Sequence, residues 1–98
     1  MPLSKSQQKH LKSLAHKLDP VVRVGQHGLS EGLLAELDIA LAQHELLKLK
    51  LSVGDRELRD KMIGELCEHS GAELVQRIGN VAVLYRRNPE QQKITLPA

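Results

Sequence analysis

The sequence predicts one α/β domain, in which three helices pack on a mixed four-stranded sheet in the order α-β-α-β-α-β-β. The chain has 98 residues, the size of a single domain. Segments of helical and of strand periodicity alternate along it, with short connections and no internal repeat. It contains no Trp, no Phe and one Tyr, so its core must be aliphatic. We expect one domain over 1–98, with a core at about 3–87 and a loosely held tail at 88–98.

The first two elements are a helix at about 4–18 and a short strand at 21–24. Ser4 and Gln7 have the spacing of a capping box, which marks the start of a helix. The apolar stripe of this helix comprises Leu11, Leu14, Ala15 and Leu18. The opposite face comprises Lys5, Lys9, Lys12 and His16. Pro20 disfavours the α conformation in the residue before it, so the helix ends there.

A second helix and a second strand follow at 30–44 and 46–51. Ser30 is the expected N-cap of the helix. The strand alternates leucine and lysine, which predicts one buried and one outward face. Its outward residues are Lys48 and Lys50.

The last three elements are a helix that opens at Gly54-Asp55 and closes at Gly71, and strands at 74–78 and 81–86. Gly79-Asn80 between these strands fits a two-residue hairpin turn with glycine first. The two β-α-β crossovers should be right-handed and should place parallel strands, with an antiparallel hairpin at the end.

Several classes of function are disfavoured by the composition. Cys67, the lone cysteine, can form neither an internal disulfide nor a four-thiolate zinc site. The five histidines are scattered, and no pair of carboxylates stands out. We therefore expect no metal, no cofactor, no small-molecule substrate and no catalytic residue, so the protein should not be an enzyme. No apolar run approaches the ~20 residues of a membrane span, and residues 1–9 lack the apolar stretch of a signal peptide. A cytoplasmic protein without a membrane partner is expected.

The charge is unevenly distributed along the chain. Residues 1–27 contain five basic residues and one acidic residue, and residues 76–98 contain four and one. Residues 28–75 contain five basic and ten acidic residues. Such asymmetry is compatible with a polyanionic partner and equally with an ordinary mixed surface.

The loop Gly25-Gln26-His27-Gly28 joins a strand to the start of a helix. Two glycines permit positive φ and close approach of a ligand to the backbone, and a helix N-terminus favours anions. A GxxG loop is how KH domains clamp a nucleic-acid backbone. The alternative is a tight turn with no ligand.

Two further groups of basic residues could support a phosphate site. The helical spacing aligns Lys5, Lys9 and Lys12, which suits phosphates or, alternatively, a solvated helix face. The outward positions of the strands hold Arg23, Lys48, Lys50 and Arg77. These form a basic face only if they share one side of the sheet. With Tyr85 as the only aromatic residue, binding should depend on phosphates and RNA shape, with modest sequence preference.

Four stretches carry a family resemblance: 11–16 (LKSLAH), 20–33 (PVVRVGQHGLSEGL), 44–50 (HELLKLK) and 79–86 (GNVAVLYR). They resemble the YhbY-like family, the stand-alone bacterial form of the CRM domain, named for chloroplast RNA splicing and ribosome maturation. The resemblance extends from about residue 3 to residue 97. It implies a fold similar to the C-terminal domain of bacterial translation initiation factor three. It also implies association with precursors of the large ribosomal subunit, and RNA contact through the GxxG loop.

The leading hypothesis is therefore a monomeric ribosome assembly factor that binds ribosomal RNA. Its expected RNA-binding residues are Gly25, Gln26, His27, Gly28, Lys5, Lys9, Lys12 and Arg23. The alternative is a protein-interaction module that docks on a ribosomal or other protein. Salt distinguishes the two, because phosphate binding weakens steeply with salt and an apolar interface does not.

Overall fold

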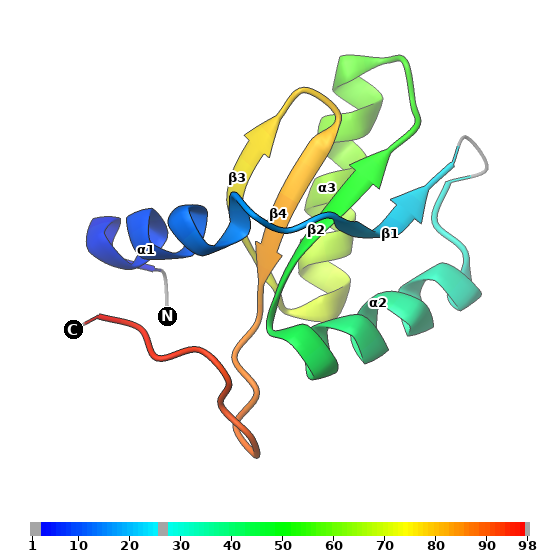
Figure 1. Cartoon of the computed structure of the whole chain (residues 1–98). Coiled ribbons are helices and arrows are strands. Elements are labelled where there is room, and N and C mark those ends of the chain that lie inside the picture. Colours follow the sequence, from blue (N-terminus) through cyan, green and yellow to red (C-terminus); the bar gives the residue numbers. More distant parts are fainter. Residues whose placement is uncertain (1–2, 26–27, 98) are drawn as a thin grey trace.

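The computed structural model describes residues 3–25 and 28–97, and its elements follow the predicted order (Figure 1). The helices are α1 (Lys5–Ala15), α2 (Glu31–His44) and α3 (Arg56–Ser70). The strands are β1 (Pro20–Val24), β2 (Leu46–Leu51), β3 (Glu73–Ile78) and β4 (Val81–Tyr85). No described helix is both long and apolar enough to cross a membrane.

The four strands form one mixed sheet in the order β1-β2-β4-β3. β1 and β2 pair in parallel, whereas β4 lies between β2 and β3 and is antiparallel to both. β2 and β3 therefore run in the same direction without touching. The predicted parallel strands and terminal hairpin are confirmed, and Gly79 has the positive φ of 58° that the turn requires.

The helix boundaries follow from local hydrogen bonds. The Ser4 hydroxyl accepts from the Gln7 backbone N–H, and the Gln7 side chain accepts from the Ser4 N–H, so the capping box is complete. Ser30 and Asp55 cap the two other helices. α3 ends at Gly71, which adopts the left-handed conformation with φ 73°.

One predicted boundary is wrong: α1 ends at Ala15 instead of about residue 18. The Leu18 N–H donates to the Ala15 carbonyl at 2.9 Å, which closes a tight turn in place of another helical turn. The chain must then cross the sheet from α1 to β1 at its edge, a path seen in front of the sheet in Figure 1. Leu18 consequently remains 38% exposed and is not part of the buried stripe.

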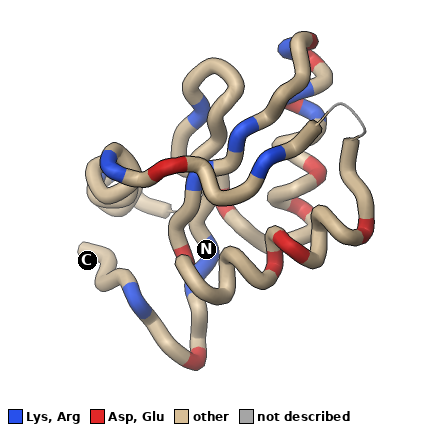
Figure 2. Tube along the Cα trace, turned by 45° about the vertical axis from the view of Figure 1, so that its right-hand side comes forward, with Lys and Arg blue, Asp and Glu red and all other residues tan. Residues whose placement is uncertain are grey.

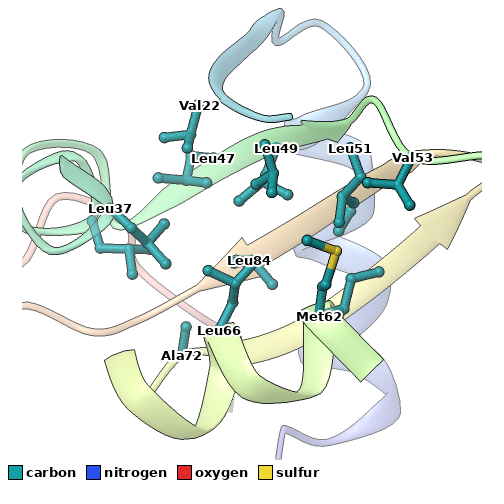
Figure 3. Packing of buried hydrophobic residues seen from close by; sticks show 14 residues of the cluster. Val22, Leu37, Leu47, Leu49, Leu51, Val53, Met62, Leu66, Ala72 and Leu84 are labelled. Carbon is teal, nitrogen blue, oxygen red and sulfur yellow. The ribbon is translucent and has the colours of Figure 1, made fainter. Parts of the chain in front are cut away.

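The helices cover the two sheet faces unequally. α2 and α3 pack on one face, where leucines of β2 meet side chains of α3 such as Met62 and Leu66 (Figure 3). On the other face, α1 contributes Leu11 and Ala15 to a smaller cluster. Its other buried members are Leu46, Val75, Val83 and Tyr85. α1 therefore covers only part of its face.

The segment 88–97 has no regular secondary structure, but defined contacts hold it. Ile94 and Leu96 pack against the α1 cluster. The buried carboxylate of Glu45 accepts backbone N–H bonds from Asn88, Lys93 and Ile94 at 2.8, 2.6 and 2.7 Å. The Glu45 contacts hold the first part of the segment at the end of α2, and a hydrogen bond from the Gln7 side chain to the Pro97 carbonyl brings its last residues to the start of α1 (Figure 1).

Candidate functional site

The part of the sheet that α1 leaves open is basic. From Leu47 to Leu51 the leucines of β2 alternate with its lysines, and these leucines face α2 and α3. Lys48 and Lys50 therefore lie on the α1 side, and Arg23 of β1 pairs in register with Lys50. Arg23 is exposed and both lysines are half-buried. Three cations of two adjacent strands thus share this open surface.

α1 and the part of the sheet that it leaves uncovered form a groove of about 380 Å³. We call it the basic groove; its lining residues are Lys9, Lys12, Ser13, Ala15, His16, Lys48, Gln76 and Ile78. Helix and sheet thus supply lysines to the same groove, which their sequence separation does not reveal. Among the described residues, no Asp or Glu lines it.

The acidic residues mostly lie elsewhere. Figure 2 shows red segments along α2, red and blue segments mixed on α3, and blue segments on β1 and β2. This separation accounts for the acidic middle of the sequence, which contains both helices. The α1 side of the sheet therefore presents a positive surface, formed by the lysines of the groove and by Arg23.

The GxxG loop lies at the end of β1, two residues beyond Arg23. Gly28 has φ 81° and donates its N–H to the Gly25 carbonyl at 3.2 Å, while Gly25 is exposed. The adjoining N–H of Ser52 donates to the Val24 carbonyl at 2.8 Å, which ties the end of β1 to the segment after β2. Gln26 and His27, predicted to contact RNA, lie outside the described residues.

The start of α2 is only partly available to an anion. The Ser30 hydroxyl already accepts the Leu33 N–H at 3.1 Å. Glu31 adds a carboxylate to the first turn of the helix, where it competes with an external anion. The lysines of the basic groove are therefore the stronger source of anion attraction.

The predicted site residues are only partly brought together. Lys9 and Lys12 line the basic groove, and Arg23 lies on the same side of the sheet next to the loop. Lys5 is exposed at the first position of α1 and does not line the groove.

Two arginines of the basic C-terminal region lie away from the basic groove and contact α2 and α3 instead. Arg77 faces α3, where its Nε lies 2.9 Å from Asp60 Oδ1. Arg86 donates to Asp38 Oδ1 and to the carbonyls of Asp38 and Ser70, so it joins α2 to the end of α3. The possible four-membered basic face of the sheet thus reduces to Arg23, Lys48 and Lys50.

Gln76 is a groove residue that the sequence pattern did not reveal. β3 contains a bulge between Leu74 and Gln76. The bulge breaks the alternation, so that Val75 packs in the α1 cluster and Gln76 also lines the groove on that side. No residue in 74–78 is glycine or proline, so no sequence signal marked the irregularity.

Within the described residues, the structure offers little that could support nucleophilic or metal-assisted catalysis. Burial raises the pKa of the Cys67 thiol, which keeps it protonated and weakly nucleophilic at neutral pH. Within residues 3–25 and 28–97, no three His, Cys, Asp or Glu side chains are placed to share a metal ion. The arrangement of the groove is suited to holding an anion in place.

The chain is similar to known proteins over nearly its whole length. The model of the CRS1 / YhbY (CRM) domain matches residues 3–86. A Pseudomonas aeruginosa protein named "Probable RNA-binding protein PA4753" is 47% identical over 93 residues, covering 95% of this chain and 89% of the relative. A Haemophilus influenzae protein named "RNA-binding protein" is 47% identical over 95 residues, covering 97% of this chain and 95% of the relative. A solution structure from Staphylococcus aureus, described as a candidate RNA-binding protein, has a TM-score of 0.83 at 33% identity, covering 98% of this chain and all of that one.

Proposed function

Since this chain belongs to the CRS1 / YhbY (CRM) domain family, we propose that it binds RNA without catalysing a reaction. The observation that supports this most directly is the basic groove, where Lys9 and Lys12 of α1 and Lys48 of β2 line one hollow. Relatives of this family that match most of the chain are named as RNA-binding proteins. The lysines of the groove suit a polyanion, and the names of the relatives indicate that this polyanion is RNA.

The proposed contact surface extends from the groove to the loop. Lysine suits phosphate because it supplies a flexible point charge without a fixed geometry. Arg23 and Lys50 continue the positive surface along the sheet toward Gly25. Gly25, Gln26, His27 and Gly28 would bring RNA close to the backbone, and Lys5 would add a more distant charge.

We further propose that the RNA is ribosomal and belongs to precursors of the large subunit, so that the protein acts as an assembly factor in the bacterial cytoplasm. This part rests on the family resemblance of the four sequence stretches. A small domain that binds mainly through phosphates is compatible with such a role, because an assembling particle presents folded RNA.

Substitution of Lys12 tests the RNA proposal. Lys12→Glu should weaken binding and reduce the slope of log K against log salt by ~0.7–0.9, the loss of one phosphate contact. Binding is measured by fluorescence anisotropy with labelled RNA at several salt concentrations. Arg87→Glu is the matched control, since it changes the charge equally at an exposed position outside the groove. Equal effects of the two variants, or no effect of either, would contradict the proposed surface.

A further inference from the structure

The basic groove contains more than positive charge. Ser13 of α1 and Gln76 of β3 line it together with the lysines. Gln76 is half-buried, and across the described residues neither side chain forms a hydrogen bond. A carboxamide held at a groove wall offers one acceptor and two donors to a ligand.

The groove also has apolar surface. Two apolar residues line it, the buried Ala15 and Ile78, which is 63% exposed. A large aliphatic side chain so exposed on a sheet face is a ready contact for a flat apolar surface. The register places Ile78 at the end of β3, on the row that also contains Val81, Lys50 and Arg23.

These three kinds of surface match the phosphate of a nucleotide and the edge and the face of its base. Lysines suit the phosphate, an amide suits the hydrogen-bonding edge of a base, and an aliphatic side chain suits its face. The volume of about 380 Å³ falls in the range of small-ligand sites, ~300–1,000 Å³. A base in a duplex cannot enter such a groove, because it is stacked and its pairing edge is occupied.

We propose that the basic groove is a subsite for one unpaired nucleotide of the bound RNA. Lys9, Lys12 and Lys48 hold its phosphate, Gln76 contacts the base edge and Ile78 contacts the base face. The proposal rests on the proposed RNA binding and adds a preference for single-stranded RNA and for the identity of one base. It departs from the expectation that a chain almost without aromatic residues reads only phosphates and shape.

The test compares Gln76→Leu with the unchanged chain on labelled single strands of oligo(U), oligo(A) and oligo(C), and on a duplex of the same length. Gln76→Leu should weaken binding to the preferred single strand about five-fold. The dissociation constants of the three single strands should therefore become more similar to one another. The salt slope and the duplex affinity should stay unchanged. Gln43→Leu, at an exposed position on α2, is the matched control and should leave all values unchanged.

Ile78→Ser provides a second variant whose exposed position spares the fold. It should also weaken single-strand binding. The subsite is refuted if the unchanged chain binds the three single strands within about two-fold of one another, or if both variants bind each single strand as tightly as the unchanged chain does. In that case, loss of binding in Lys12→Glu would still support RNA binding itself. Absence of any RNA binding by the unchanged chain would refute both proposals.

Discussion

At the scale of single residues, Glu45 shows how a buried charge can be stable. It ends α2 with a φ of 60°, in the part of backbone space that residues other than glycine rarely adopt. Burial acts to raise the pKa of its carboxyl, but the N–H donors of Asn88, Lys93 and Ile94 lower it below its ordinary value. The charged form is therefore the one that the fold favours.

Glu45→Gln should destabilise the protein by ~1–3 kcal/mol. The NH₂ group of glutamine would face one of the backbone N–H groups that now donate to the carboxylate, so that two donors would meet and a buried hydrogen bond would be lost. Urea denaturation at neutral pH measures this change.

The low pKa of Glu45 also means that the stability contributed by its carboxylate is complete above pH 4.5 and is lost as the pH falls through the folded-state pKa. The stability of the unchanged chain should therefore decline more steeply in acid than that of Glu45→Gln. Parallel pH profiles would contradict this account.

At the scale of elements, the connection from β1 to α2 depends on one of its two described glycines. Gly28 has φ 81°, which a side chain strains, whereas Gly25 has neither a positive φ nor any atom within 4 Å of an added Cβ. The space around Gly28 is ordinary, since the nearest atom would be Met62 Cε at 3.8 Å. The requirement for glycine at 28 is thus conformational and not steric.

Gly28→Ala should accordingly cost ~1–2 kcal/mol of stability, while Gly25→Ala should be neutral or slightly stabilising. Thermal unfolding of both variants measures the difference. A similar loss in the two would mean that the loop, and not the φ of one residue, limits stability.

The elements themselves were largely predictable from the sequence, and the site was not. Caps such as Ser4, Ser30 and Asp55 and the leucine–lysine alternation of β2 are local signals, and each predicted element was found. The groove depends on two features that no local sequence pattern signals: α1 covers only part of one sheet face, and a bulge turns Gln76 toward that face. Arg77 looked equivalent to Lys48 in the sequence, yet the same bulge directs it to Asp60. Lys9 and Lys12 were identified because helical spacing alone aligns them.

At the scale of the whole molecule, the sheet face that carries α1 is more basic than the face covered by α2 and α3. This difference predicts that association with ribosomal particles in a cell extract depends on salt. In a sucrose gradient of cell extract, the protein should migrate with large-subunit particles at low salt and leave them at high salt. Blotting the fractions at both salt concentrations measures this. Co-migration that persists at high salt would favour docking through a protein partner, and recovery only at the top at low salt would contradict the ribosomal proposal.

The aliphatic core has a practical consequence for optical spectroscopy. Tyr85, the one Trp, Tyr or Phe side chain of the sequence, is buried in the cluster beneath α1 and the segment 88–97. Near-ultraviolet absorbance and emission of the protein without RNA therefore come from a single ring, which is not among the residues that line the basic groove. Burial and the nearby charge of Glu45 raise the pKa of its phenol. While α1 stays docked, the phenol therefore loses its proton at a higher pH than a tyrosine exposed to water. One natural chromophore thus reports whether α1 and the segment 88–97 stay packed on this cluster.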